Sequence, residues 1–522
     1  MYNMSKISDN YFGPKAVYDH FMAITRLSHP SGNENLVRNY VVECAGKIDN
    51  VQTTFYEPEA KAPGERVIVL RRPGSGKHSA EDSYVTLQAH MDMVCYPNND
   101  IFPLQVCDYD IKGEKWIKAC AEANISDSDK GTTLGADDGI GVATALAILE
   151  DENLKEYPIE CLFTVQEETN MGGAKGFDKG LLLGRRYINL DAEDAPIIIY
   201  GSAGGCDVVY EGTVEWSHME DEFVALKVSI SGLNGGHSGL NINKGRLNAI
   251  KALTEVLIRL NERITNLDVG EEVASYDLRL VSMERDEKPY LNSIPSKASA
   301  VIVIPQDKED GLKKDLNAYC RALKAQYQSV ESGFKCVVED AKGSDQSLDR
   351  ISTDALLCLL RQIPHGVIRM IPEKENVKLV ETSTNLADID IREDKVVIKA
   401  SNRSSNDASM FALKNIQKSI GDCLNFSVTH SDGYPSWQPN ESSVLLEKAK
   451  LVYRRIYGDD CGATVIHAGL ECTYIVQKYG NEMDCISIGP TIVDPHTGGE
   501  RLKASTLKQF YKALTELIPQ LY

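Results

Sequence analysis

The sequence lacks three features that would narrow its class at once: paired cysteines, long apolar runs and an excess of basic residues. Its 13 cysteines are scattered and form no CxxC motif, so we expect reduced thiols and a cytoplasmic location. The longest apolar stretches are far shorter than the roughly 20 residues of a membrane-spanning helix. The first residues also lack the basic-then-apolar pattern of a signal peptide. We therefore expect no membrane association.

The charge balance is strongly acidic. Lys and Arg number 56 against 76 Asp and Glu, which gives a formal net charge of −20. An acidic surface repels the phosphate backbone of nucleic acids, so we expect no nucleic-acid partner. The same surplus of carboxylates is compatible with a site built from carboxylates and cations.

At 522 residues the chain exceeds one ordinary domain, and we expect two. In the first two hundred residues, short apolar runs alternate with helical patterns. This is typical of an α/β domain with a mostly parallel sheet flanked by helices. The expected strands cover residues 66–70, 84–87, 159–165 and 187–190, and an expected helix covers 139–150. Ligands of such a sheet gather at the carboxyl ends of its strands.

The pattern changes near Cys206. Longer amphipathic helices, 246–263 and 312–327, mix with alternating strands at 223–228 and within 377–403, and the α/β pattern returns at 463–466 and 485–488. We therefore predict a discontinuous catalytic domain, residues 1–205 and 430–522. An α+β lid domain, residues 206–429, is inserted into it. This insert is long enough to contain two similar halves.

Ligand-type side chains stand where the expected strands end. One strand leads into His90, and another leads into the adjacent carboxylates Glu167 and Glu168. Two carboxylates at the edge of a core are costly unless a cation or a proton offsets their charge. Imidazole and carboxylate together suit zinc, with manganese or cobalt as substitutes. The sequence thus predicts a metal site, whose candidate ligands are His90, Asp137, Glu168, Asp191 and His496.

Short motifs in chain order resemble those of a known family, the co-catalytic zinc peptidases of the carboxypeptidase-G2 and carnosinase type. These motifs are His90-Met91-Asp92, Gly135-Ala136-Asp137-Asp138-Gly139, Gln166-Glu167-Glu168 and Asn189-Leu190-Asp191-Ala192-Glu193. Further motifs resemble a narrower group, the bacterial aminoacyl-histidine dipeptidases (peptidase D). They are residues 131–137, Gly235-Gly236-His237-Ser238-Gly239, His467-Ala468-Gly469-Leu470-Glu471-Cys472 and Gly489-Pro490-Thr491 with Pro495-His496. The resemblance covers nearly the whole chain.

The resemblance implies two divalent metal ions, with His90 and Asp191 on one, Glu168 and His496 on the other, and Asp137 bridging them. Three carboxylates against two dications leave roughly one positive charge, so a water bridging both ions is expected to lose its proton near neutral pH. Glu167, beside a ligand, is the expected general base. Asp92 is expected to hold the second nitrogen of His90. The family also implies a cis peptide bond between Asp137 and Asp138.

The inserted domain is expected to supply substrate contacts. By resemblance, His237 polarises the scissile carbonyl or stabilises the oxyanion. Asn292 and Arg403 are expected to grip that carbonyl and the free C-terminal carboxylate, for which the planar fork of arginine is suited. Glu471 is a candidate receptor for the substrate's amino terminus, which would restrict the enzyme to short peptides.

The sequence therefore predicts a metallo-dipeptidase that hydrolyses unblocked dipeptides, including Xaa-His types such as β-alanyl-histidine. Two alternatives remain: an N-acyl amino acid deacylase on the same metal site, and a metal-bound binding protein without catalysis. A thiol nucleophile at Cys95 is a further alternative, although no paired base accompanies it. The expected partners are small peptides, and the resemblance is compatible with a homodimer.

Overall fold

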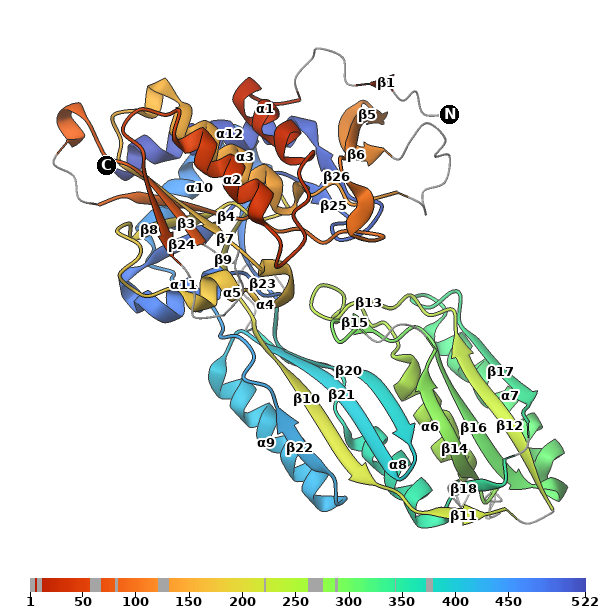
Figure 1. Ribbon diagram of the computed structural model, residues 1–522. Helices are drawn as coiled ribbons and strands as arrows, with labels where there is room; N and C mark the ends of the chain where they lie inside the picture. The colour runs from red at the N-terminus through yellow and green to blue at the C-terminus, as the bar shows by residue number, and fades with distance from the viewer. Residues whose placement is uncertain are drawn as a thin grey trace. The chain divides into compact units, whose positions relative to one another are not determined.

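The computed structural model describes residues 5–6, 12–56, 67–79, 83–120, 131–219, 222–261, 276–286, 290–342, 344–371 and 379–522. The chain folds into two compact units (Figure 1). Unit 1 comprises Met1–Ser202, Trp437–Val465 and Leu470–Tyr522, and unit 2 comprises Ala203–Ser436 and Ile466–Gly469.

Unit 1 is built on an eight-stranded sheet in the order β2-β3-β7-β4-β8-β24-β9-β23. Its four central strands run parallel: β7 (Ile159–Thr164), β4 (Val85–His90), β8 (Arg186–Asn189) and β24 (Asp484–Ser487). On either side, β3 (Val67–Arg72) and β9 (Ile197–Ser202) pair antiparallel with this centre. The edges are β2 (Gln52–Tyr56) and β23 (Gly462–Ile466).

Helices cover the centre of this sheet, and the burial pattern reflects it. Every residue of β4 and β7 is buried, as expected for parallel strands enclosed on both faces. The helix α3 (Ala136–Glu150) is buried from Ala136 to Leu149, and it packs on β4, on β7 and on α1 (Lys15–Ile24). The helices α10 (Val444–Tyr457) and α11 (Cys472–Tyr479) pack on β24.

Unit 1 also contains α2 (Asn35–Ala45), α4 (Glu167–Asn170), α5 (Gly172–Gly176), α12 (Ala504–Leu517) and a second sheet. That sheet has the order β1-β5-β6-β26-β25 and is antiparallel. Its strands are β1 (Ser5–Lys6), β5 (Gln105–Ile111), β6 (Glu114–Cys120), β26 (Arg501–Lys503) and β25 (Ile492–Val493).

Unit 2 consists of two halves with the same βαββαβ topology. The first half runs β12 (Phe223–Ser231), α6 (Ala249–Asn261), β14 (Arg279–Arg285), β16 (Ala298–Pro305), α7 (Glu309–Tyr327) and β17 (Lys335–Asp340). The second half runs β10 (Gly204–Thr213), α8 (Arg350–Gln362), β20 (Val380–Arg392), β21 (Lys395–Ser404), α9 (Asp407–Cys423) and β22 (Ser427–His430). Their antiparallel sheets have equivalent orders, β14-β16-β12-β17 and β20-β21-β10-β22, and β19 (Gly366–Met370) is added beside β20.

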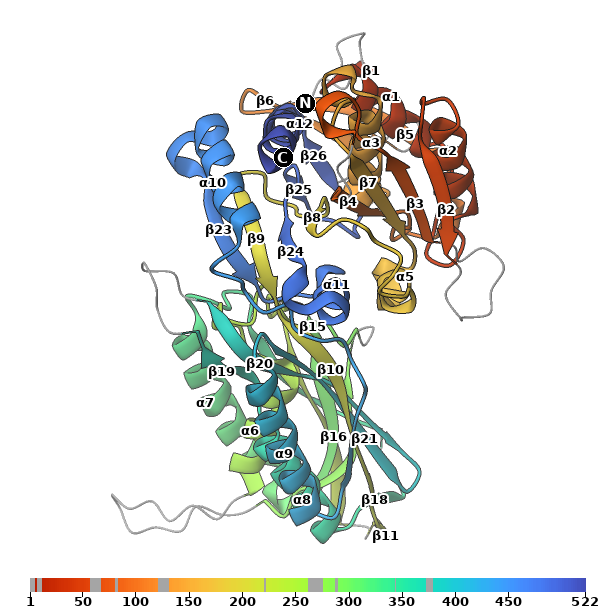
Figure 2. The same cartoon turned by 90° about the vertical axis from the view of Figure 1, so that its left-hand side faces the viewer.

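Equivalent elements of the two halves contact each other. The helix α6 packs on α8, and β14 lies against β20, which is the arrangement of an isologous interface within one chain. One hydrophobic core includes residues of both halves. Figure 2 shows the four helices lying along the strands of unit 2. Two short ribbons complete the unit: β11 (Trp216–His218) with β18 (Gln346–Leu348), and β13 (Gly236–His237) with β15 (Ser293–Ile294).

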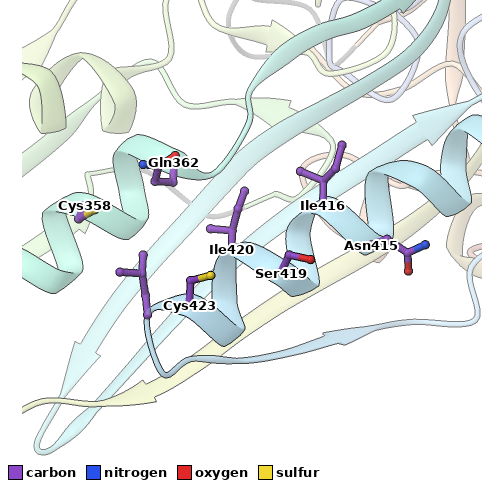
Figure 3. A pocket seen from close by; sticks show the side chains of 8 residues that line it. Cys358, Gln362, Asn415, Ile416, Ser419, Ile420 and Cys423 are labelled. Atoms are coloured by element: carbon purple, nitrogen blue, oxygen red, sulfur yellow. The ribbon is translucent and has the colours of Figure 1, made fainter.

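A pocket lies between α8 and α9 (Figure 3). Its lining consists of Cys358, Gln362, Asn415, Ile416, Ser419, Ile420, Cys423 and Leu424. No residue predicted for the catalytic, metal or substrate site is among them, so this pocket is separate from those residues.

The predicted α/β class is confirmed, with the parallel ladders confined to the sheet centre. Residues 203–205, 430–436 and Ile466–Gly469, which we expected in the catalytic domain, group with unit 2. The expectation of reduced thiols throughout differs from the structure, which pairs Cys107 with Cys120 and Cys320 with Cys336 in disulfides. Both pairs join neighbouring elements, with Cα atoms 6.1 and 5.9 Å apart. Across the described ranges, no helix is both long enough and apolar enough to span a bilayer.

Candidate metal centre and active site

Three of the candidate ligands follow directly from the parallel strands of unit 1. His90 is the last residue of β4, Glu168 lies in α4 just after β7, and Asp191 comes just after β8. Because the carboxyl ends of parallel strands meet at one edge of a sheet, these side chains converge. Asp137 lies in the first turn of α3, and His496 follows β25 with a left-handed backbone (φ 62°).

His90 lies between two carboxylates. Its Nε2 is 3.0 Å from Oδ1 of Asp137 and 3.5 Å from Oδ1 of Asp191. The side chains of His90, Asp137 and Glu168 offer ligand atoms close enough to share one metal ion, and so do those of His90, Asp138 and Asp191. The structure therefore brings together His90, Asp137, Glu168 and Asp191 as the sequence predicts.

The second imidazole approaches from the other side of Asp137. Nε2 of His496 is 2.9 Å from Oδ2 of Asp137 and 2.8 Å from Oε2 of Glu168. Asp137 thus turns one carboxylate oxygen toward His90 and the other toward His496. This is the arrangement required of a carboxylate that bridges two ions.

The buried carboxylates and imidazoles of this cluster shift one another's pKa values. Burial raises the pKa of Glu168 to about 7, with a further contribution from the charge of Asp137. Burial likewise raises the pKa of Asp191 to about 6. Burial would lower the pKa of His496, but its hydrogen bonds to Asp137 and Glu168 raise it to about 12. For Asp137 burial is opposed by hydrogen bonds from His496 and His90, which hold its pKa well below the usual range.

The donor set fits divalent metal ions. Within the described residues, the ion pairs of Asp137, Glu168 and Asp191 are made with histidine and never with Lys or Arg. Oε1 of Glu168 is buried and has no hydrogen-bond partner there. A buried carboxylate oxygen without a donor is costly unless a cation meets it. Two imidazoles with three carboxylates is a donor set suited to zinc and its neighbours.

Asp92 acts on the neighbouring turn more than on His90. Its Oδ1 accepts a hydrogen bond from the backbone N–H of Glu167 (3.0 Å), and its Oδ2 accepts from the N–H of Glu168 (3.2 Å) and from Oγ of Ser31 (2.7 Å). Nδ1 of His90 is nearer to the backbone oxygen of Asp92 (3.0 Å) than to its carboxylate (3.5 Å). Asp92 therefore fixes the turn that presents Glu167 and Glu168.

Glu167, the expected base, is partly buried beside this cluster. Burial raises the pKa of its carboxyl well above the usual range, and the charges of Glu168, Asp191 and Glu471 add to that effect. Its neighbour Gln166 has a left-handed backbone (φ 57°), so the chain turns sharply between β7 and α4 and projects Glu167 from the strand end.

Among the residues that the structure describes, Asp138 accepts hydrogen bonds from backbone and forms no ion pair with Lys or Arg. Its Oδ2 accepts a hydrogen bond from the N–H of His90 (3.2 Å), and its Oδ1 accepts from the N–H of Gly141 (3.0 Å). A Cβ at Gly141 would lie 2.1 Å from this Oδ1, so glycine is required there. The peptide bond between Asp137 and Asp138 is cis, as the resemblance implies.

Sequence reasoning missed two buried carboxylates that hold this site. Glu500 accepts hydrogen bonds from four successive backbone N–H groups, those of residues 134–137. Oε1 of Glu34 accepts from the N–H groups of Gly32 and Gln166. Neither lies at the end of a predicted strand, so no pattern in the sequence marked them.

Glu471 is fully buried (0 % exposed) under the strand ends. Its Oε2 accepts hydrogen bonds from Nε2 of Gln88 and Oγ1 of Thr164, both at 2.6 Å, and its Oε1 has no partner within the described chain. Burial raises the pKa of Glu471 to about 8, against the opposing charge of His90. One of its oxygens is thus committed to the sheet, and the other remains for a cationic or donating group.

In unit 2, His237 lies in the ribbon formed by β13 and β15. Its Nδ1 accepts hydrogen bonds from the backbone N–H groups of Gly239 (3.2 Å) and Leu240 (3.1 Å). An Nδ1 that accepts cannot carry a proton, so in the neutral ring the proton is on Nε2. Asn292 is exposed on the same ribbon, where its backbone oxygen accepts from the N–H of Ser238 (2.7 Å).

Arg403, in β21, is buried (8 % exposed) and lies beside His237. Its Nη1 donates to the hydroxyl of Tyr434 (2.9 Å), its Nη2 lies 3.5 Å from Nε2 of His237, and its Nε has no partner in the described structure. Nε2 of His467 lies 2.7 Å from Oγ of Ser383. Burial together with the charge of Arg403 lowers the pKa of His467 to about 3. The guanidinium forms no ion pair with a carboxylate of the described residues, and the charge of Asp207 acts on it only at longer range. Such a buried guanidinium is suited to bind an anion.

The thiol alternative receives no support. Burial raises the pKa of Cys95 to about 11, so its thiolate is scarce at neutral pH. Its sulfur lies 4.0 Å from the backbone oxygen of Met93.

The chain is similar to known peptidases along nearly its whole length. The chain is 32% identical over 521 residues, 99% of both proteins, to the cytosol non-specific dipeptidase of Escherichia coli (strain K12). It resembles the crystal structure of aminoacylhistidine dipeptidase from Vibrio alginolyticus with a TM-score of 0.77 and 30% identity, covering 97% of this chain and 96% of that one. A tripeptidase from Staphylococcus aureus shares the fold at a TM-score of 0.54 and 14% identity, covering 99% of each chain. Residues 86–520 match Peptidase family M20/M25/M40, and the chain belongs to this family.

Proposed function

We propose that this protein is a cytoplasmic metallo-dipeptidase that hydrolyses dipeptides with free amino and carboxyl termini, including Xaa-His types such as β-alanyl-histidine. The single observation that carries the proposal is Asp137, whose two carboxylate oxygens face His90 and His496. The full-length similarity to proteins named as a dipeptidase and an aminoacylhistidine dipeptidase supports the substrate class.

Five side chains would hold two divalent ions, for which zinc is our assignment. His90 and Asp191 would hold one, Glu168 and His496 the other, and Asp137 both. When bound, such ions supply a Lewis acid for the scissile carbonyl and lower the pKa of water. The protein's own part is to fix these ligands, and Asp92 does so for the turn that carries Glu168.

Glu167 is proposed as the general base. It would take a proton from the attacking water and deliver it to the leaving amine. Asp92 holds the backbone of Glu167 through its N–H, which fixes the direction of the carboxylate. This contact assigns Asp92 a positioning role.

Unit 2 would bind the substrate through His237, Arg403 and Asn292. The Nε2–H of His237 can donate a hydrogen bond to the carbonyl oxygen and to the oxyanion that develops from it. Arg403 would bind the C-terminal carboxylate, because its guanidinium is buried beside His237 without an acidic partner among the described residues. For Asn292, which directly precedes β15, we propose a contact with the substrate carbonyl.

Glu471 would meet the substrate's amino terminus through Oε1, the oxygen that Gln88 and Thr164 leave available. A dipeptidase requires this free amine, whereas an N-acyl deacylase does not. Glu471→Gln should therefore weaken the preference for a free amino terminus.

The test is hydrolysis of a dipeptide panel and matched N-acetyl amino acids, with and without chelator, by the wild type and Glu167→Ala. We expect chelator-sensitive cleavage of Xaa-His that falls by about 10²–10⁴-fold in Glu167→Ala, with metal content unchanged. Cleavage of N-acetyl amino acids alone by metal-loaded wild type would favour the deacylase. Binding of dipeptides without any turnover would favour a non-catalytic protein.

A further inference from the structure

The N-terminus of α3 is held by a carboxylate from the far end of the chain. Glu500 is buried (2 % exposed). Its Oε2 accepts hydrogen bonds from the N–H groups of Leu134 (2.8 Å) and Gly135 (3.1 Å). Its Oε1 accepts from those of Ala136 (2.8 Å) and Asp137 (3.4 Å). Both oxygens are therefore occupied by backbone.

These four N–H groups need an acceptor that the helix itself does not provide. The first N–H groups of a helix have no intrahelical partner, and a carboxylate at that end also interacts favourably with the helix dipole. The N-cap of α3 is Gly135, which has a left-handed backbone (φ 70°) and no side chain to cap the helix. Glu500 supplies the missing cap and, with it, the orientation of the backbone at Asp137.

The same contact joins Asp137 to the segment that carries His496. Glu500 lies four residues after His496, whose Nε2 contacts Oδ2 of Asp137. The two segments also approach through backbone alone: a Cβ on Gly131 would lie 2.0 Å from the oxygen of Gly498, and one on Gly498 would lie 2.3 Å from the oxygen of Gly131. The segments 131–137 and 496–500 are thus held together at both ends.

We propose that Glu500 is a positioning residue of the metal centre: it fixes the Asp137 backbone against the His496 segment, so that one carboxylate can serve both ions. The inference rests on the proposed two-ion function and deepens it. Glu500 is not itself a ligand, since its oxygens are taken up by the four N–H groups. Its effect on metal binding is therefore indirect.

Glu500→Gln tests this inference with little change in side-chain volume. The substitution replaces one acceptor oxygen by an NH2 group, which then faces two backbone N–H donors. The matched control is Glu160→Gln. Glu160 is also buried (0 % exposed), and it accepts from the N–H groups of Leu183 and Gly184 at the opposite end of β7 from Glu168. The measurement is titration of metal-stripped, full-length protein with Zn²⁺ in competition with a chelator of known affinity, together with the melting temperature of the stripped protein.

We expect the wild type to bind two Zn²⁺ ions. Glu500→Gln should bind at least one of them about 10–100-fold more weakly, which is the usual effect of removing a residue that holds a metal ligand in position. Glu160→Gln should lower the melting temperature and leave Zn²⁺ affinity unchanged, which is the result of a merely structural role. Wild-type affinity in Glu500→Gln would overturn the inference. If the wild type bound no Zn²⁺, the proposed metal function would fail with it.

Gly498→Ala keeps the inference testable if Glu500→Gln does not fold. The added methyl group must push the segments 131–137 and 496–500 apart, whereas the side chain of Glu500 is retained. We expect weaker Zn²⁺ binding here too. Unchanged affinity in a folded Gly498→Ala protein would contradict the coupling of the two segments.

Discussion

Several buried carboxylates of this protein bind backbone N–H groups of the loops that carry site residues. Asp92 binds the turn of Glu167 and Glu168, Glu500 binds the start of α3, and Glu331 binds the loop that carries His237. A carboxylate can accept about four hydrogen bonds, so one buried side chain can fix several backbone groups. Such residues make the geometry of a site depend on positions that are remote from its chemistry.

The role proposed for Arg403, binding of the substrate carboxylate, leads to a prediction about substrate charge. Arg403→Met keeps much of the side-chain volume and removes the charged donors. We expect KM for a dipeptide with a free carboxylate to rise about 100-fold, because a charge-assisted hydrogen bond contributes about 1.5–3 kcal/mol. KM for the corresponding dipeptide amide should stay nearly constant. Steady-state kinetics on both substrates measure the difference, and equal losses on the two would contradict a contact with the carboxylate.

His20 gives a prediction about stability and pH. Its Nε2 lies 3.2 Å from Oε1 of Glu150, and its Nδ1 lies 2.8 Å from the hydroxyl of Tyr40. Burial alone would lower the pKa of His20, but contacts with Cys44 and Glu150 raise it to about 9. A pKa raised on folding means that the stabilisation is fully present below about pH 6.5, the unfolded value, and is lost as the pH rises through 9.

Glu150→Gln should therefore destabilise unit 1 at pH 6 by about 1–2 kcal/mol, a value reduced for the partial exposure of Glu150. The loss should vanish near pH 10. Urea unfolding of the wild type and the variant at both pH values measures it. Glu152→Gln, which removes an exposed ion pair with Lys155, is the control and should cost less than about 0.5 kcal/mol at either pH. A loss that is equal at pH 6 and pH 10 would show that His20 is neutral.

The sequence predicted the proposed ligand residues but not the residues that hold them in place. His90, Glu168 and Asp191 stand at strand ends, which hydrophobic patterning reveals. Glu500 lies hundreds of residues from the N–H groups it binds, and its neighbours in sequence give no sign of that contact. A contact between distant segments is a property of the folded chain, so single-sequence patterns cannot find it.

At the scale of elements, the long loop between β12 and α6 is held at two positions by one buried carboxylate, that of Glu331. Oε2 of Glu331 accepts a hydrogen bond from the N–H of Asn234 (2.7 Å), and its Oε1 accepts from that of Leu247 (2.9 Å). These positions are the two ends of the loop that carries His237. Within the loop, the N–H of His237 donates to Oδ1 of Asn241 (2.9 Å). Glu331 is fully buried, so water cannot replace its contacts.

Glu331→Gln should loosen this loop and displace His237. We expect kcat to fall about 10-fold or more, since small misplacements of a catalytic group are costly, while Zn²⁺ content stays unchanged. Trypsin should also cleave faster at Lys244 or Arg246. Glu339→Gln, an exposed residue of β17, is the matched control. A variant with normal kcat and faster proteolysis would show that the loop position does not limit the reaction.

Element positions were predicted well where patterning is strong. The strands expected at 159–165, 187–190 and 485–488 occur as β7, β8 and β24, with ends that differ by at most one residue. The expected helix at 246–263 begins later, at Ala249, and its last two residues lie outside the described ranges. The antiparallel edges of the main sheet were not predicted, because a buried strand has the same apolar pattern in either direction.

At the scale of the whole molecule, unit 2 brings together side chains from two halves of the same topology. His237 comes from the first half and Arg403 from the second, and the two side chains lie 3.5 Å apart. Equivalent elements, α6 with α8 and β14 with β20, form the contact between the halves. The sequence indicated that the insert was long enough for two halves. Their repeated topology became visible only in the sheet orders.

The location of the proposed ligands leads to a prediction about how metal binding changes the thermal stability of each unit. All five proposed ligands belong to unit 1. An ion that binds only the folded state stabilises it by about 2.7 kcal/mol per site when its free concentration is 100 times Kd. Zn²⁺ should therefore raise the melting temperature of unit 1, and a chelator should reverse the change. The transition of unit 2 should not move.

Calorimetry of the full chain, stripped and reloaded with Zn²⁺, measures both transitions, because a protein with two units need not unfold in one step. Lys251→Met identifies the transition of unit 2. Nζ of Lys251 donates to the carbonyl oxygens of Leu360, Arg361 and Ile363 at the end of α8, so its loss should lower that transition alone. Movement of both transitions with Zn²⁺ would show that the units unfold together, and the metal centre would then stabilise the substrate-binding unit as well as its own.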